Sequence, residues 1–144
     1  MSDVIANAQR PDPGTLCCGR MDASALAAAK AAGVEWVIDL LPETECAGFD
    51  EAAACAALQL GYARLPIAGA ADLNRENVAA FDRLLADSPA PMVLVHCASG
   101  NRVGALYALR AGWLQGKSPL QALAVGRAHG LTKLEPVVAQ LLQA

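Results

Sequence analysis

Short apolar runs alternate with Ala-rich or amphipathic segments along this chain, and that alternation limits the possible folds more than any other feature. The runs at residues 35–41, 62–65 and 92–96 are apolar or β-branched and lie next to Gly or Pro, which is typical of buried strands. Strands separated by helical segments need crossover connections. The sequence therefore predicts an α/β fold with a central, mostly parallel sheet of four or five strands and helices on both faces.

Helix caps and stops divide the rest of the chain. Asp22 is expected to cap a helix that Gly33 ends, and Gly61 is expected to end the next helix. The other expected elements are an extended stretch at 15–18 and helices at 23–32, 50–60, 75–86, 102–114, 119–128 and 133–143. The polar residues 1–14 carry Pro and Gly and predict a mobile lead. Residues 15–144 then form a single domain with one core of ordinary size.

The charge balance and the cysteines exclude several classes of protein. Lys and Arg number 11 against 14 Asp and Glu, so the net charge of −3 lacks the basic excess of nucleic-acid-binding proteins. The apolar runs fall far short of the roughly 20 residues that span a bilayer, and the first ten residues do not resemble a secretory signal. Five cysteines without a Cys-x-x-Cys pair, and only two histidines, predict neither disulfides nor a metal site. We expect a cytoplasmic protein that binds neither nucleic acid nor membrane.

The chemistry is concentrated in the segment from Val93 to Gly104, which is typical of a strand, a tight loop and a helix. The loop N–H groups should converge in front of the helix, and such a helix N-terminus is an anion site. The same field lowers the pKa of a thiol, so Cys97 is predicted to be a thiolate and a nucleophile at neutral pH. The residues expected to bind the anion are Ala98, Ser99, Gly100 and Asn101.

Two further residues of this segment are candidates for the site. Arg102 can offer a planar fork to two oxygens of a phosphate or sulfate-like group. His96 can orient the Cys97 thiolate, or it is a buried histidine of the core. Loops that follow parallel strands meet at one edge of the sheet, and this rule brings the loops beginning at Asp39, Pro66 and Cys97 together. Near those strand ends, ordinary loop solvation explains Asp39 and also Glu45.

The run His96-Cys-Ala-Ser-Gly-Asn-Arg102 resembles the phosphate-binding loop of the cysteine-dependent tyrosine and dual-specificity phosphatases. The wider pattern is similar to their bacterial relatives, the beta-lactamase-hydrolase-like, phosphatase-like domain family. That resemblance covers Leu16 to nearly the C-terminus and includes Leu16-Cys-Cys-Gly-Arg-Met21, Val37-Ile-Asp-Leu-Leu-Pro-Glu-Thr-Glu45 and Leu65-Pro-Ile67. It implies a protein-tyrosine-phosphatase-like fold and a metal-free hydrolase without a cofactor.

The resemblance also implies a role for each site residue. Cys97 would attack the phosphorus of a phosphomonoester and form a phosphocysteine, while Arg102 and the loop amides hold the oxygens. An acid from the loop after the third strand would protonate the leaving group. By its position we assign that role to Asp72, with Glu76 as the second choice. The expected partners are a phosphorylated small molecule or a phosphoprotein, with a phosphate or sulfate ion in the loop.

Two departures from the phosphatase pattern keep other functions open. Four residues separate Cys97 from Arg102, whereas the phosphatases have five, and the shorter spacing is also seen in rhodanese-type sulfurtransferases. Val103 stands where the phosphatases usually have Ser or Thr, which would slow hydrolysis of the intermediate. The alternatives are therefore a sulfurtransferase carrying a persulfide on Cys97, which needs no acid, and a phosphate-binding module with low turnover.

Overall fold

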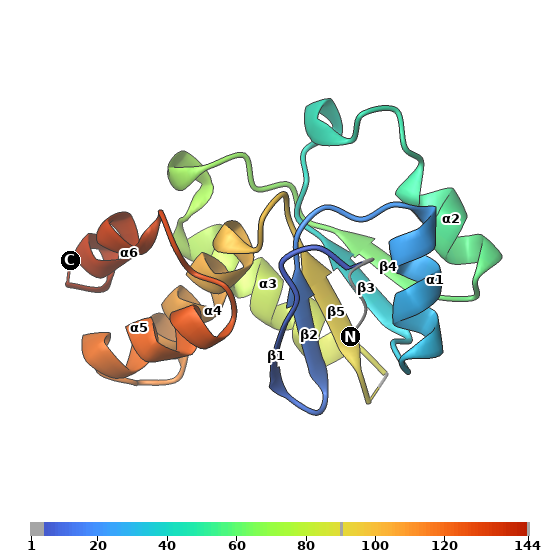
Figure 1. The fold of residues 1–144 in the computed structure, drawn as a ribbon. Coiled ribbons are helices and arrows are strands. Elements are labelled where there is room, and N and C mark those ends of the chain that lie inside the picture. The colour runs from blue at the N-terminus through green and yellow to red at the C-terminus, as the bar shows by residue number, and fades with distance from the viewer. Residues whose placement is uncertain (1–4, 90, 144) are drawn as a thin grey trace.

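A computed structural model describes residues 5–89 and 91–143 and has the predicted α/β architecture (Figure 1). The strands are β1 (Gln9–Asp12), β2 (Thr15–Cys18), β3 (Trp36–Asp39), β4 (Gly61–Arg64) and β5 (Val93–His96). The α-helices are α1 (Ala23–Ala31), α2 (Glu51–Ala57), α3 (Arg75–Asp87), α4 (Asn101–Leu114), α5 (Pro119–Ala128) and α6 (Glu135–Gln143). Two short 3₁₀ helices, η1 (Glu43–Glu45) and η2 (Ala70–Asp72), follow β3 and β4.

The five strands form one sheet in the order β1-β2-β5-β3-β4. Strand β5 lies in the middle and runs parallel to both neighbours, with Cys18 and Asp39 each paired to His96. The β1 strand is antiparallel to β2. It lies within the segment expected to be a lead, and the sequence analysis did not predict it. The first four residues of that segment lie outside the described residues.

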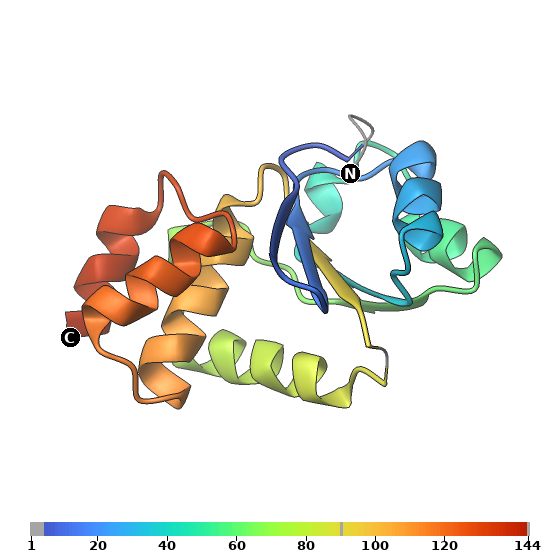
Figure 2. The same ribbon diagram turned by 60° about the horizontal axis from the view of Figure 1, so that its bottom comes forward.

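Helices cover both faces of the sheet, as predicted (Figures 1 and 2). Helices α1 and α2 pack on one face over a core that includes Leu26, Cys55 and Leu94. Helices α3 to α6 lie on the other face, over a larger core that includes Phe81 and Leu106. Successive residues of a strand point to opposite faces, so β2, β3 and β5 each contribute side chains to both cores.

Local sequence signals explain most of the helix ends. Asp22 accepts a hydrogen bond from Ala25 N at 2.8 Å, and Gly33 has a φ of +107°, so both act as predicted on α1. The expectation that Gly61 ends the second helix is wrong. Helix α2 ends at Ala57, and Gly61 begins β4, where a Cβ would lie 2.0 Å from the Trp36 ring. Gly61 is therefore a packing glycine.

Candidate active site

Cys97 lies directly after β5 and in front of α4, at the carboxyl edge of the parallel strands. Its side chain is buried, and Gly100 N donates a hydrogen bond to Sγ at 3.1 Å. Gly100 adopts a φ of +91° at the N-terminus of α4, a conformation that suits glycine. The first N–H groups of a helix have no partner within it. The thiol and the free end of the helix are therefore neighbours, in the arrangement that the sequence predicts.

The segment around Cys97 is tied to two other parts of the chain. Cys97 N donates to Cys18 O at 3.3 Å, and Arg20 N donates to Ala98 O at 3.1 Å. The Asn101 side chain accepts from Thr132 N at 2.9 Å, so it holds the α5–α6 connection. Among the predicted anion-binding residues, Ser99 is exposed while Ala98 and Asn101 are half-buried. The side chain of Asn101 is thus already hydrogen-bonded, so this residue would bind an anion through its backbone N–H group.

Arg102 joins the three loops that follow β3, β4 and β5. Its guanidinium forms a two-point ion pair with Glu45, with distances of 2.7 Å from Nη2 to Oε1 and 3.0 Å from Nη1 to Oε2. Nη1 also donates to Ile67 O at 2.6 Å. The side chain of Arg102 is 13% exposed and that of Glu45 is 30% exposed. The expectation that loop solvation accounts for Glu45 is wrong, because Arg102 binds the carboxylate.

The pair with Arg102 changes the titration of both groups. The hydrogen bond from Arg102 lowers the pKa of the Glu45 carboxyl below its usual value, with Arg20 adding a smaller effect in the same direction. The pKa of Arg102 is raised, first by Glu45 and also by the nearby Cys97. Because folding favours the ionised carboxylate, the pair stabilises the fold above the usual Glu pKa and loses that contribution as the pH falls through the lowered value.

Glu45 competes with any anion for the fork of Arg102. The Glu45→Gln variant removes this competing ion pair. Because a partly exposed ion pair contributes little free energy, we expect the Kd for inorganic phosphate to fall by only about two- to fivefold. Isothermal titration of phosphate into wild type and variant measures the change. Glu43→Gln alters an exposed carboxyl of the same 3₁₀ helix and serves as the control. Unchanged or weaker binding in Glu45→Gln would contradict this competition.

Asp72 lies at the end of η2, in the loop after β4. Its Oδ2 accepts a hydrogen bond from Ala68 N at 2.8 Å, next to the Ile67 carbonyl that Arg102 contacts. The cap of α3 is Asn74, whose side chain accepts from Asn77 N at 2.8 Å. The structure thus places Asp72 in the expected loop and on the same segment as a contact of Arg102.

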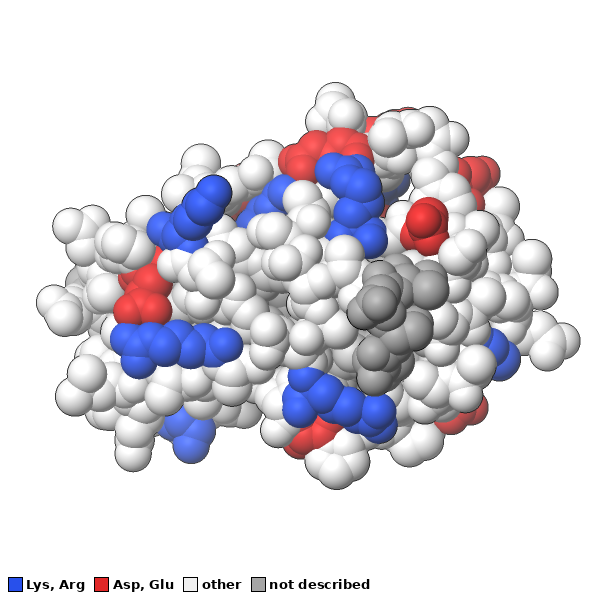
Figure 3. Space-filling model, in the orientation of Figure 1, with Lys and Arg blue, Asp and Glu red and all other residues white. Residues whose placement is uncertain are grey.

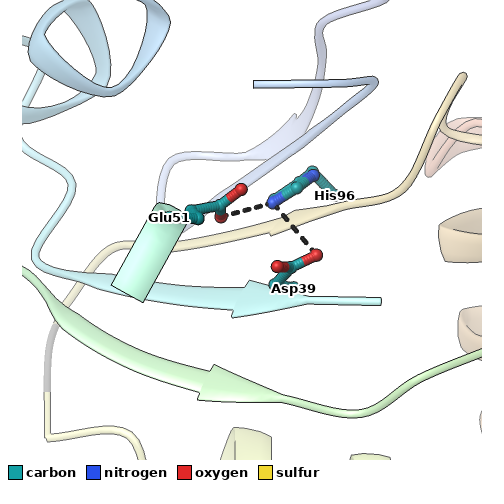
Figure 4. Close-up of side chains that lie close together, drawn as sticks. All are labelled: Asp39, Glu51 and His96. Carbon is teal, nitrogen blue, oxygen red and sulfur yellow. Dashed lines mark hydrogen bonds and ion pairs between the residues drawn. The ribbon is translucent and has the colours of Figure 1, made fainter. Parts of the chain in front are cut away.

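His96 is fully buried, and its ring belongs to a different cluster from Cys97. Its Nε2 atom lies 2.6 Å from Glu51 Oε2 and 3.5 Å from Asp39 Oδ1 (Figure 4). Cys97 instead packs within the core on the α4 face. His96 therefore contacts carboxylates rather than the thiol. These contacts agree with the hypothesis of a buried histidine of the core, and not with that of a residue that orients the Cys97 thiolate. Asp39 is 1% exposed and Glu51 6% exposed, so loop solvation does not account for Asp39 either.

Sequence reasoning missed the roles of Glu45 and Glu51. The signal for Glu45 was its place in the loop after β3, which the sheet topology brings to Cys97. For Glu51 no local signal was available, because it lies on α2 and its contact with His96, 45 residues away, depends on tertiary packing.

On the face shown in Figure 3, Lys and Arg side chains are scattered and several lie beside Asp or Glu. The described residues on that face form no broad basic surface. No helix in the described part of the chain is long and apolar enough to cross a membrane.

Comparison with solved structures shows which fold this is. A protein named "putative phosphatase" (DUF442) from Shewanella putrefaciens is 22% identical, with a TM-score of 0.73 over 96% of this chain and 92% of that one. A second protein of that name, from Neisseria meningitidis, is 20% identical, with a TM-score of 0.75 over 92% of this chain and 94% of the other. TpbA from P. aeruginosa, in complex with pTyr, is 19% identical, with a TM-score of 0.71 over 99% and 91%. The chain has the tyrosine-phosphatase-like fold.

These structures confirm the predicted fold class and, at the level of the fold, the predicted resemblance to the tyrosine phosphatases. No family model matches the sequence, and no curated protein matches it. The narrower resemblance to the beta-lactamase-hydrolase-like domains stays a prediction. Arg102, at the start of α4, contacts the loop after β3 through Glu45 and the loop after β4 through Ile67.

Proposed function

We propose that this chain is a cysteine-dependent phosphatase-like hydrolase that cleaves a phosphomonoester through a phosphocysteine on Cys97. The observation that carries the proposal is the position of Cys97 between the end of β5 and the free N-terminus of α4, within a phosphatase-like fold. Partial positive charge at a helix N-terminus stabilises both a thiolate and a bound phosphate.

In the proposed reaction, Cys97 Sγ attacks phosphorus and the bond from phosphorus to the leaving oxygen breaks. Arg102 and the N–H groups of residues 98–101 hold the phosphoryl oxygens as charge develops on them. Arg102 must turn at least part of its fork from Glu45 to the substrate, because both terminal nitrogens contact Glu45. Water then hydrolyses the phosphocysteine and releases phosphate.

The substrate class is a phosphorylated small molecule or phosphoprotein. The complex of TpbA with pTyr supports this choice, since the folds agree over 99% of this chain.

Steady-state hydrolysis of an aryl phosphate tests the proposed function. We expect wild-type protein to release phosphate without added metal, and to yield a phosphocysteine that mass spectrometry detects after a rapid acid quench. The same preparations should be assayed for thiocyanate formation from thiosulfate and cyanide. Thiocyanate without phosphate release would overturn the proposal in favour of a sulfurtransferase.

The sulfurtransferase is the second candidate because four residues separate Cys97 from Arg102. In that function Cys97 would carry a persulfide, and Asp72 would have no catalytic role. Phosphate binding without either activity would instead indicate a binding module.

Asp72 is the proposed general acid. For an alkyl phosphomonoester, whose alkoxide is a poor leaving group, we expect Asp72→Asn to lower kcat by about 10²- to 10⁴-fold. This is the usual contribution of general acid catalysis. With a good leaving group such as nitrophenolate the loss should be much smaller, because protonation matters less. Comparing the two substrates in wild type and Asp72→Asn measures this difference. Equal losses with both substrates would show that Asp72 supports the loop rather than donating a proton.

A further inference from the structure

We infer that Asp39, Glu51 and His96 form a binding site for a divalent metal cation, separate from the Cys97 loop. One ligand atom of each residue lies within 4.8 Å of the others, and all three side chains are buried. They come from three elements, β3, α2 and β5, which the fold brings together at the carboxyl edge of the sheet (Figure 4). Two carboxylate oxygens and one imidazole nitrogen are a donor set that suits Mn²⁺ or Zn²⁺.

The charges of these three side chains do not balance one another. With both carboxylates ionised, even an imidazolium at His96 leaves one buried negative charge uncompensated, which is costly in an apolar surrounding. A divalent cation bound to His96 Nε2 and the two carboxylates would compensate that charge.

A cavity of about 490 Å³ borders the two carboxylates of the cluster, whereas the fully buried His96 is not among its lining residues. Asp39 and Glu51 line this cavity, and Glu43 and Asp50 lie exposed on its lining. Arg64, the basic residue of the lining, is hydrogen-bonded to Leu41 O at 3.0 Å and contacts Cys46 Sγ. The lining therefore carries four acidic groups and one basic group that is already engaged, and it attracts cations.

Neighbouring groups orient the ligands, as expected around a metal. Tyr62 donates its hydroxyl hydrogen to Asp39 Oδ2 at 2.7 Å, and Leu41 N donates to Oδ1 at 2.9 Å. Burial raises the pKa of the nearby Cys55 to about 12, so its thiol adds no charge. In the metal-bound form the cation would stand in place of the direct contact between His96 Nε2 and Glu51 Oε2.

Titration of Mn²⁺ into reduced, chelator-treated protein tests the site by calorimetry and by electron paramagnetic resonance. Mn²⁺ prefers carboxylate and imidazole to thiolate, so the five cysteines do not obscure the result. We expect one Mn²⁺ per chain, no measurable binding in Glu51→Gln, and a loss of about 10- to 100-fold in affinity in Tyr62→Phe, which alters only the orienting group. Glu43→Gln removes an exposed charge from the same cavity and should change the affinity by less than about twofold.

Three results would overturn the inference. The first is that wild-type protein binds no stoichiometric Mn²⁺. The second is that Tyr62→Phe binds Mn²⁺ with the affinity of wild type. The third is that Glu43→Gln loses as much affinity as Glu51→Gln, which would indicate diffuse attraction of the cation to the acidic cavity. Thermal melts followed by circular dichroism establish that each variant is folded, and Tyr62→Phe keeps the test decisive if Glu51→Gln does not fold. The readout does not involve phosphate release, so its outcome is independent of the proposed hydrolase activity.

Discussion

Cys97→Ser is expected to lower phosphate release from an aryl phosphate on the order of 10⁴-fold, because a serine hydroxyl is a far weaker nucleophile than a thiolate at neutral pH. The side chain is buried, and the substitution exchanges one sulfur for one oxygen, so the fold should be retained. The variant should still bind inorganic phosphate, since the loop N–H groups and Arg102 are unchanged. Steady-state kinetics and phosphate titration on one preparation measure both effects.

Cys46→Ser is the matched control for Cys97→Ser. Cys46 is a half-buried thiol in the loop after β3, where it contacts Pro42 O at 3.5 Å, and it has no part in the proposed reaction. Activity within about twofold of wild type is expected, as for a conservative change away from the reacting atoms. Phosphate release that persisted in Cys97→Ser would show that another group carries the hydrolysis and would remove the main support for the proposed mechanism.

Arg102→Lys should lower kcat/KM for the same substrate by about 10²- to 10³-fold, the loss seen when one main donor to a developing oxyanion is removed. Lysine keeps the positive charge but not the planar fork, so it cannot hold two phosphoryl oxygens at once. It also loses the two-point pair with Glu45. Kinetics together with a thermal melt separate the catalytic effect from any change in stability.

Arg110→Lys is the control on the same helix. Arg110 Nε donates to Asp82 Oδ1 at 2.8 Å, so this residue also forms an ion pair, but with α3 and away from the Cys97 loop. Its replacement should leave kcat/KM within about twofold of wild type. Equal losses of kcat/KM in the two lysine variants would mean that the ion pairs of α4 affect activity through the stability of the fold. Arg102 would then not bind the substrate.

The strands and helices were predictable because their signals are local. Apolar runs bounded by Gly or Pro mark β3 and β5, and the Asp22 cap with the Gly33 stop marks α1. The β1 strand was not predicted, because it contains Pro11 and depends on pairing with β2. Proline is tolerated at a sheet edge, and β1 is an edge strand.

The sequence by itself determined the α/β fold class and the strand, loop and helix around Cys97, since the spacing of apolar residues and the Gly100 turn act over a few neighbours. Only the tertiary structure decided that Glu45 binds Arg102, 57 residues away, and that Asp39 and Glu51 enclose His96. The physical reason is that these contacts depend on strand order. Parallel pairing of β3 with β5 brings their carboxyl ends to one edge, and no local pattern encodes which side chains then meet there.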